Sequence, residues 1–286
     1  MSLLDFFARK EEYKNKNSAK VVVIIKSKDP NVELIKTGVF EFWDRVKISI
    51  PKSIIYIEDF SKPSPHAGKV ADAYIEDYKK YPKIHLNAKS HDNKKRVFSS
   101  IMHEIDHFKN MEWRNIQRRV NPRINKAIKN LRRIDYSRYY FRDFLYATLS
   151  EGSARFAQNT LIRNIHFNDS EFLTIYGLAK NEAELFLNIW NRYIQFYRTN
   201  NLKEAGNEIK EITNLCKRSY TIGFHIYYTL ACKGKYPVLK KDIFKIINLY
   251  EETIISMGYK PVISINSGKG ILDYNALVSS WYGLEK

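Results

Sequence analysis

The sequence contains very little cysteine. Among its 286 residues only Cys216 and Cys232 carry thiols, whereas small secreted proteins that rely on disulfides carry several closely spaced pairs. If a single helix joins the two cysteines, a rise of about 1.5 Å per residue separates them by about 24 Å, far beyond disulfide reach. We therefore predict two reduced thiols in the protein core, as is typical of a cytoplasmic protein.

Long hydrophobic runs are also missing. No stretch approaches the roughly 18 apolar residues of a membrane span. Residues 1–9 place an acidic residue within a short apolar stretch, with no basic region before it, unlike a signal peptide. We find no internal repeat and no low-complexity segment. Because 44% of the residues are apolar, the chain can form a sizeable core, and we expect a cytoplasmic protein of one large domain or two lobes, without membrane contact.

Acidic residues are outnumbered by basic ones. Lys and Arg number 48 against 31 Asp and Glu, so the formal net charge is +17. Residues 111–142 hold ten basic and two acidic residues, with tyrosines interleaved at Tyr136, Tyr139 and Tyr140. A solvated helix face is the first interpretation of this segment. Nucleic-acid binding is the second, because phosphates attract Lys and Arg while bases stack on aromatic rings. A preference for acidic protein substrates is the third.

The most informative motif present is His103-Glu-Ile-Asp-His107. On a helix, two histidines four residues apart project from one face and can bind a single metal ion. Glu104 follows the first histidine, at a position where a carboxylate can take a proton from water at the metal. These residue types at this spacing predict a zinc site and a hydrolytic reaction.

A zinc hydrolase needs a third protein ligand besides His103 and His107, and a fourth position for water. The best candidate is Glu151, which lies in a helix-like segment over residues 149–156. The three residues that follow it, Gly152-Ser-Ala154, are small. We expect them to let this helix approach the histidine helix closely enough for the carboxylate to reach the ion.

The motif His103-Glu-x-x-His107 followed by Glu151-Gly-x-Ala154 resembles the gluzincin branch of zinc metallopeptidases, the thermolysin-like group that includes the minigluzincins. The resemblance covers residues 20–160. It implies a zinc ion bound by the two histidines and Glu151, with Glu104 as the general base in peptide-bond hydrolysis. Two features depart from the thermolysin pattern: the stretch between His107 and Glu151 is longer, and Arg155 stands where the family has an aspartate.

The resemblance also implies a zincin-like α+β fold. We expect an N-terminal α/β lobe over residues 1–110 that ends in the motif helix, and a mainly helical C-terminal lobe over residues 111–286 that carries the third ligand. The active-site cleft would lie between these lobes. An edge strand of the sheet would pair with an extended protein or peptide substrate, and residues 83–88, just before the motif helix, are similar in placement to that strand.

Apolar periodicity locates the individual elements. It predicts strands at 20–25, 53–58 and 68–77 and a helix at 31–46. Beyond about residue 92 the pattern is helical. The predicted helices in that part cover 159–165, 170–200, 203–232 and 240–257, and residues 260–269 are predicted to form a loop.

A hydrolytic site also needs a group that stabilises the oxyanion, and the family uses a Tyr or His from the helical lobe. The candidates are Tyr220 and His225, in a segment where Gly223 permits the close approach of another element. Because aromatic residues and a histidine on an apolar helix usually belong to a core, each candidate alone is more often structural.

Two other functions compete with a gluzincin peptidase. One is a nucleic-acid-associated basic protein, or a SprT-like protease that acts on DNA-bound proteins, which would need a later histidine such as His166 as its third ligand. The other is an inactive zincin-fold protein, although no residue of the motif is missing. The metzincin continuation does not fit, because Asn110 and Trp113 stand where glycine and histidine are needed.

Overall fold

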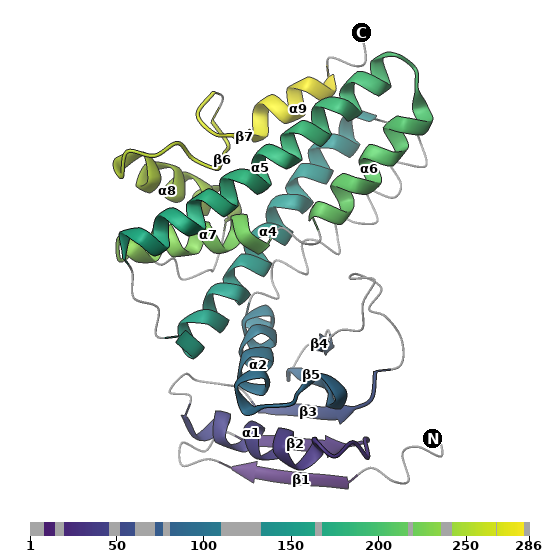
Figure 1. Cartoon of the computed structure of the whole chain (residues 1–286), viewed down its shortest axis with the longest axis vertical. Coiled ribbons are helices and arrows are strands. Elements are labelled where there is room, and N and C mark those ends of the chain that lie inside the picture. The colour runs from purple at the N-terminus through teal and green to yellow at the C-terminus, as the bar shows by residue number, and fades with distance from the viewer. Residues whose placement is uncertain are drawn as a thin grey trace. The chain divides into compact units, whose positions relative to one another are not determined.

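The computed structural model of the chain describes residues 9–14, 20–45, 52–60, 72–76, 81–109, 133–163, 168–216, 220–235, 242–266 and 268–282. Within these residues the fold is α+β, with a five-stranded and a two-stranded sheet and many helices (Figure 1). The chain divides into two compact units. The first comprises Met1–Lys109 and Ala157–Ile165, and the second comprises Asn110–Phe156 and His166–Lys286. Helix α4 (Arg133–Arg163) therefore contributes residues to both units.

The first unit is built on the five-stranded sheet, whose strand order is β1-β2-β3-β5-β4. The strands are β1 (Arg9–Lys14), β2 (Lys20–Ile25), β3 (Ser53–Glu58), β4 (Ala73–Glu76) and β5 (Lys83–Asn87). β2, β3 and β5 run parallel, whereas β1 and β4 are antiparallel to their neighbours and form the two edges. The nearly continuous apolar run of β2 is typical of an inner parallel strand.

Helices α1 (Val32–Arg45) and α2 (Lys94–Lys109) pack against one face of this sheet. Alternate strand residues point to that face, because side chains alternate along a strand. The resulting core joins residues of the strands, Val21, Val23, Ile55, Ile57, Ile84 and Leu86, to helix residues Ile35, Val39, Phe42, Val97, Ile101 and Ile105. This core fixes the orientation of α2, the helix that carries the histidine motif.

The other face of the sheet carries a row of stacked rings. His85 of β5 stacks on Tyr56 of β3 and on Tyr74 of β4, with ring centroids 4.5 Å and 4.4 Å apart. Its Nδ1 lies 2.5 Å from a carboxylate oxygen of Glu58, and its Nε2 lies 3.0 Å from one of Glu76. Both ring nitrogens of His85 therefore have partners, and the row ties three strands together.

Two expectations for this sheet were wrong or incomplete. Residues 83–88 were predicted to include the edge strand, but β5 lies between β3 and β4 and is hydrogen bonded on both sides. The edge strand on that side is β4, which runs antiparallel to β5. It lies within the range 68–77 that was predicted to be a strand. β1 was not predicted, because its charged sequence RKEEYK lacks the apolar alternation of a typical strand. Charged side chains are nevertheless common on edge strands.

The described part of the second unit is mainly helical. Besides most of α4 it contains α5 (Asp169–Arg198), α6 (Leu202–Cys216), α7 (Tyr220–Cys232), α8 (Ile243–Ser256) and α9 (Tyr274–Tyr282), together with the short strands β6 (Ile263–Ser264) and β7 (Leu272–Asp273). α5 packs against both α6 and α7, and α7 packs against α8. The Trp190 indole N–H donates to Ser280 Oγ at 3.0 Å, which fastens α9 to α5.

The predicted helix at 203–232 was wrong, because two helices, α6 and α7, occupy this range. Apolar residues continue from α6 into α7, and no glycine or proline stands between the two helices, so the break was not visible in the sequence. The helices differ in character, since α6 is amphipathic whereas α7 is buried on nearly all sides. The argument that one helix separates the two cysteines therefore fails, although Cys232 is a free thiol.

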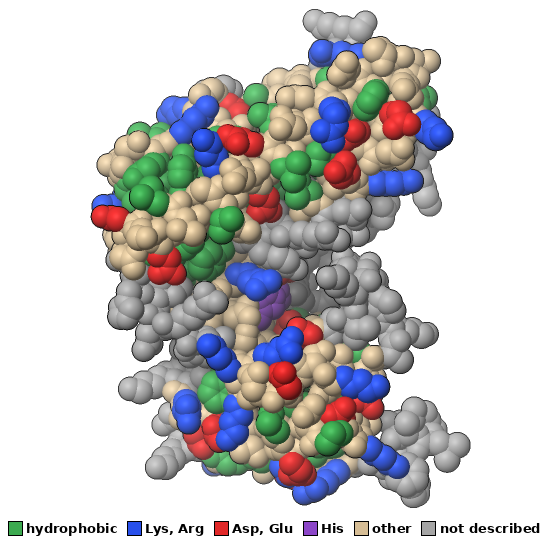
Figure 2. Space-filling model, in the orientation of Figure 1, with side chains coloured by type: hydrophobic (Ala, Val, Ile, Leu, Met, Phe, Trp, Pro, Cys, Tyr) green, Lys and Arg blue, Asp and Glu red, His purple; other side chains and the backbone are tan. Residues whose placement is uncertain are grey.

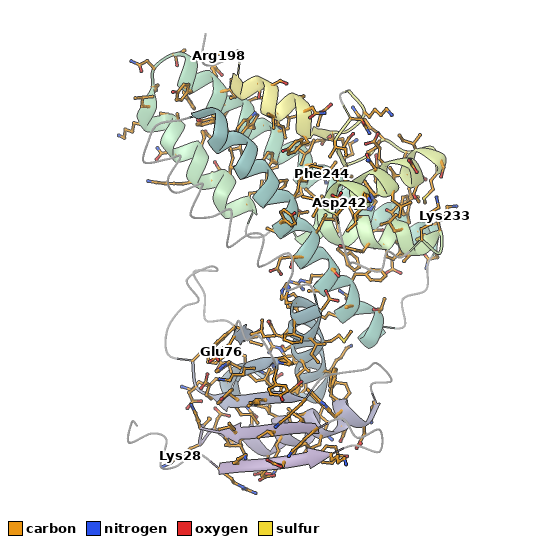
Figure 3. All side chains as sticks on the ribbon, turned by 180° about the vertical axis from the view of Figure 1, so that it is seen from behind. Lys28, Glu76, Arg198, Lys233, Asp242 and Phe244 are labelled. Atoms are coloured by element: carbon orange, nitrogen blue, oxygen red, sulfur yellow. The ribbon has the colours of Figure 1, made fainter. Side chains whose placement is uncertain are left out.

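Charged side chains of both signs lie on the described surface. On the face shown in Figure 2, Lys and Arg side chains are interspersed with Asp and Glu. No helix within the described ranges is long and apolar enough to cross a membrane. At the start of α8, Asp242 Oδ1 accepts a hydrogen bond from the backbone N–H of Phe244 at 3.0 Å, an ordinary helix cap (Figure 3).

Candidate metal centre

Helix α2 presents the histidine motif on the side away from the sheet. The helix starts after Asn93, whose Oδ1 accepts a backbone hydrogen bond from the first turn at 2.9 Å. Ile101 and Ile105 are fully buried in the sheet core. His103 and His107 each follow one of these isoleucines by two positions, about 200° around the helix. The two imidazoles therefore face away from the sheet.

The two imidazoles converge on one point. The Nε2 atoms of His103 and His107 lie 3.0 Å apart. The ring planes are nearly perpendicular, at 89°, with centroids 4.5 Å apart. Two nitrogens bound to one tetrahedral zinc at about 2.0–2.1 Å lie about 3.3 Å from each other. A shift of a few tenths of an ångström would thus let both rings share one ion.

Glu151 completes a group of three potential ligands. One ligand atom each from His103, His107 and Glu151 lies within 4.8 Å of the other two. His107 is 3% exposed, whereas His103 and Glu151 are half-buried. Two imidazole nitrogens and a carboxylate oxygen form a donor set that zinc hydrolases use. The partial exposure of two ligands provides the solvent access that a fourth ligand, water, requires.

The position of Glu151 follows from the path of α4. The last turns of this helix pack in the first unit, where the Gln158 amide donates a hydrogen bond to Ser99 Oγ on α2. Glu151 precedes Gln158 by close to two helical turns, so both side chains lie on one face of α4. Ser99, His103 and His107 likewise share one face of α2. The face of α4 that contacts Ser99 is thus the face that carries Glu151, and the face of α2 that contacts Gln158 is the one that carries both histidines.

Glu104 occupies a nearly buried position beside the ligands. Its side chain is on α2, directly after His103, and the residue is 6% exposed. Among the described residues its carboxylate has no hydrogen-bond or ion-pair partner. A carboxylate that the protein does not engage is able to accept a proton from water.

The other described histidines of the first unit are accounted for by structural contacts. His85 is held by Glu58 and Glu76, as described above. His91 is fully buried, with Nδ1 2.8 Å from the Asn87 carbonyl oxygen and Nε2 2.9 Å from Ser100 Oγ. Burial lowers the pKa of His91, which keeps its ring neutral. These two histidines are therefore satisfied structural groups and not metal ligands.

Gly152 has a different neighbour from the one that we expected. We predicted that Gly152 lets α4 approach the histidine helix. The atoms nearest to the position that a Cβ would take at Gly152 instead belong to Gly223 of α7. A Cβ added at Gly152 would lie 2.6 Å from the Gly223 carbonyl oxygen, and one added at Gly223 would lie 2.8 Å from Gly152 Cα. Side chains cannot fit there, so the two glycines allow backbone contact between α4 and α7.

The structure does not bring His225 to the ligand group. His225 is fully buried in the second unit, with rings of Phe172, Tyr176 and Tyr250 around it. It follows Gly223 by two positions, so its ring points away from the side of α7 that contacts α4. Burial lowers the pKa of His225 to about 3, so the ring is a neutral core group.

Several predicted residues lie outside the described side chains. Tyr220 begins α7, but its side chain lies outside the described residues. His166 also lies outside them. The basic segment 111–142 is described only as backbone from residue 133 onward, so the predicted nucleic-acid contact falls outside the described side chains.

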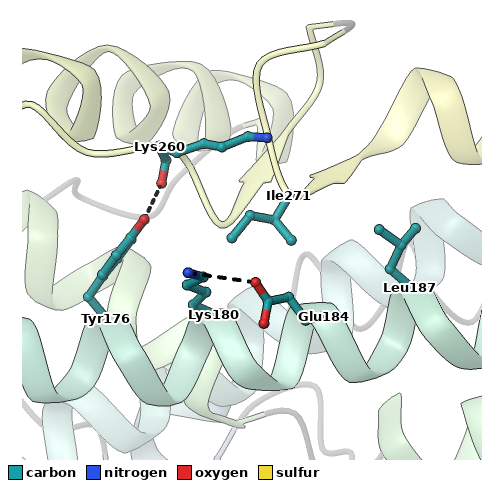
Figure 4. Close-up of a pocket in the computed structure, with 6 residues that line it drawn as sticks. All are labelled: Tyr176, Lys180, Glu184, Leu187, Lys260 and Ile271. Atoms are coloured by element: carbon teal, nitrogen blue, oxygen red, sulfur yellow. Dashed lines mark hydrogen bonds and ion pairs between the residues drawn. The ribbon is translucent and has the colours of Figure 1, made fainter.

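A cavity of about 390 Å³ lies in the second unit and contains none of the candidate residues. Its lining is Tyr176, Lys180, Glu184, Leu187, Lys260 and Ile271 (Figure 4). Tyr176 donates its hydroxyl hydrogen bond to the Lys260 carbonyl oxygen at 3.0 Å, and Lys180 pairs with Glu184 at 3.7 Å. The polar groups pair mainly with one another, and the cavity offers no nucleophile or metal ligand set.

The comparisons with known proteins add no relative. No protein-family model, no curated protein and no solved structure matches the chain. The assignment of the site therefore rests on the geometry of its own residues. Two contacts that shape it, Ser99 with Gln158 and Gly152 with Gly223, join segments distant in sequence. No local pattern pointed to the first pair, whereas the two mid-helix glycines were a visible signal.

Proposed function

We propose that the protein is a zinc-dependent metallopeptidase of the gluzincin kind. His103, His107 and Glu151 would hold the ion. The observation that carries the proposal is the convergence of these three ligand groups, with one atom of each within 4.8 Å of the others. Zinc, when bound, supplies Lewis acidity that polarises the substrate carbonyl and activates the attacking water.

Glu104 would perform the proton transfers. Its carboxylate accepts a proton from the attacking water and later donates it to the leaving amide nitrogen, so one group serves as base and then as acid. Its place directly after the ligand His103 supports this role, and so does the lack of another partner in the described chain. His225 has no role in this scheme, because it lies in the core of the second unit.

A peptide is the substrate class that the sheet favours. β4 pairs only with β5 within the described residues, so its other backbone edge is available for an added strand. α2 packs against β4, which puts this edge beside the histidine helix. An extended peptide that adds to an edge strand is held by main-chain hydrogen bonds with little dependence on its sequence.

The donor set also discriminates between zincin types. A SprT-like enzyme would require His166 in place of Glu151, whereas the group observed has the carboxylate within reach of both histidines. This favours the gluzincin arrangement. The alternative function, nucleic-acid association, would involve the basic segment 111–142 and not the metal ligands.

Metal analysis combined with casein cleavage tests the proposal. We expect about one zinc per chain in the wild type, bound by three protein ligands, and metal-dependent cleavage of casein. Glu104→Gln should retain zinc and lose cleavage, because it keeps the site's shape and removes the base. Glu151→Ala should lose affinity for zinc. A wild-type protein without zinc affinity, or a Glu104→Gln variant with full activity, would contradict the proposal.

A further inference from the structure

The contact between α4 and α7 leaves no room for either helix to shift. At Gly223 a Cβ would overlap the carbonyl oxygen of Thr148, so the hydrogen at that position points at this oxygen. Such Cα–H···O contacts are found where helices approach most closely. No side chain lies between the backbones of Gly152 and Gly223 to absorb a displacement. A movement of α7 at this point therefore moves the α4 backbone next to Glu151.

The first turn of α7 is held by a residue from another helix. The carboxylate of Glu182, on α5, lies at the first turn of α7, where it faces the Thr221 hydroxyl and the backbone N–H groups of Thr221 and Ile222. These N–H groups belong to the set that a helix leaves without internal partners at its start. The next residue is Gly223, so this carboxylate fixes α7 one residue before its contact with α4.

Burying the Glu182 carboxylate at the start of α7 costs more free energy than an ordinary helix cap does. Caps are ordinarily Ser, Thr, Asp or Asn side chains from the residue preceding the helix. Here a carboxylate from the middle of α5 is largely removed from water, and its Oε1 is buried with no hydrogen-bond partner among the described residues. Burying a carboxylate without full compensation is unfavourable. Its position therefore serves more than the termination of one helix.

We infer that Glu182 is a positioning residue for the metal ligand Glu151, acting through the first turn of α7 and the Gly223–Gly152 contact. This inference rests on the proposed function, because it assigns a role to the carboxylate that would bind zinc. Glu182 itself touches neither the metal ligands nor the substrate in this scheme. Its effect is on where α4 holds Glu151.

Zinc affinity, measured by competition with a chromophoric chelator, tests the inference. Glu182→Ala should lower the affinity about 10- to 100-fold, the usual effect of removing a group that orients a ligand. Glu182→Gln should restore most of it, since the amide oxygen still accepts from α7. Glu184→Ala is the matched control, because Glu184 is exposed on the same helix and pairs only with Lys180 among the described residues. It should bind zinc like the wild type.

A second readout separates positioning from general destabilisation. Cobalt(II) bound in place of zinc reports its coordination geometry through visible absorption. We expect the cobalt spectrum of Glu182→Ala to change while that of Glu182→Gln matches the wild type. An unchanged spectrum and affinity in Glu182→Ala would overturn the inference and leave the metallopeptidase proposal standing. A wild-type protein that binds neither metal would overturn both.

The pH dependence provides a test even if Glu182→Ala does not fold. Burial raises the pKa of Glu182 to about 7. The groups that face its carboxylate are the Thr221 hydroxyl and the two α7 amides, and no charged side chain of the described residues contributes. The ionised form binds these donors more strongly. The ratio of wild-type to Glu182→Gln zinc affinity should therefore rise as pH increases through 7. Titration of the histidine ligands cancels in this ratio, and a flat ratio would contradict the inference.

Discussion

Single residues with the same name have different roles in this protein, and the helical glycines show it clearly. Gly223 lies where any side chain would overlap the backbone of α4, whereas Gly206 on α6 and Gly177 on α5 have no atom within 4 Å of the position that a Cβ would take. All three lie inside helices, where glycine is unfavourable relative to alanine. Only the first has a packing reason for being glycine.

Alanine substitutions should therefore have opposite effects at these positions. Gly206→Ala should raise the free energy of unfolding by about 0.5–1 kcal/mol, because alanine loses less conformational entropy in a helix. Gly223→Ala should lower it by about 1–3 kcal/mol, the usual cost of inserting atoms into a filled space. Denaturant unfolding measures both, with Gly177→Ala as a second control. Equal effects at positions 206 and 223 would show that the α4–α7 contact is not tight.

The sequence predicts residues of the site where their relation is local. The spacing of His103 and His107 sets their common helix face whatever the fold, and Glu151 stands out by its small neighbours. Glu182 could not be predicted, because its role depends on the start of α7 lying against the middle of α5. His225 was proposed because the resembled family uses a Tyr or His from the helical lobe. Its actual place among aromatic rings depends on the packing of three helices.

At the scale of secondary-structure elements, three strands are joined by contacts on the sheet face opposite the helices. His85 is stacked between Tyr56 and Tyr74 and bound to Glu58 and Glu76. The hydrogen bond with His85 is the main cause that lowers the pKa of Glu58, in spite of partial burial. This carboxylate therefore helps to hold β3 and β5 together only while it is ionised.

The stability of the sheet should accordingly depend on pH on the acid side. A carboxylate whose pKa is lower in the folded state contributes stability above its unfolded pKa, about 4.5 here, and loses it as pH falls through the folded value. The wild type should therefore lose stability below pH 4.5 more steeply than Glu58→Gln. Denaturant unfolding between pH 3 and pH 6 measures the two slopes. Glu252→Gln, an exposed position on α8, is the control and should follow the wild type.

The bounds of a helix or strand were predicted well where a single apolar pattern begins and ends with that helix or strand. β2, β3 and α1 fall within a residue or two of the predicted ranges, because each has its own apolar periodicity. The pattern cannot show which strand lies at an edge, and so β5 was misplaced relative to β4. It also cannot separate α6 from α7, because apolar residues continue from one into the other with no glycine or proline between the two helices.

At the scale of the whole molecule, the proposed metal site draws on segments that are distant in the chain. Two ligands are on α2 and the third is on α4, which contributes residues to both compact units. A ligand that binds only the folded chain stabilises it in proportion to the logarithm of its concentration. Zinc should therefore act on the stability of the protein as a whole.

Thermal unfolding with and without zinc measures this effect. Zinc at about 100 times its dissociation constant should add about 2.7 kcal/mol, which corresponds to an increase in Tm of roughly 5 °C for a chain of this size. A chelator should reverse the increase. His107→Ala should show no increase, whereas His91→Gln, although less stable, should still respond to zinc. A response of the same size in His107→Ala would place the metal elsewhere.

The net charge of +17 gives a separate prediction for nucleic acids. We expect weak binding without sequence preference, since the attraction is to phosphates. If about six phosphates are neutralised, the affinity should fall about 10³-fold between 50 and 200 mM salt. Fluorescence anisotropy with duplex and single-stranded DNA measures the slope. Replacing Arg118, Arg119 and Arg123 with Gln should flatten it, and an unchanged slope would show that the basic segment is only solvated.

The division of α4 between the units also matters for how the protein is made. The ribosome completes the sheet and α2 first, but the turns of α4 that pack with them begin only at Ala157. At about 5–20 residues per second, translation of the intervening stretch takes several seconds. During that interval the nascent chain carries both imidazoles without their carboxylate partner. We therefore expect metal capture to be a late event in biosynthesis, after the chain has passed residue 151.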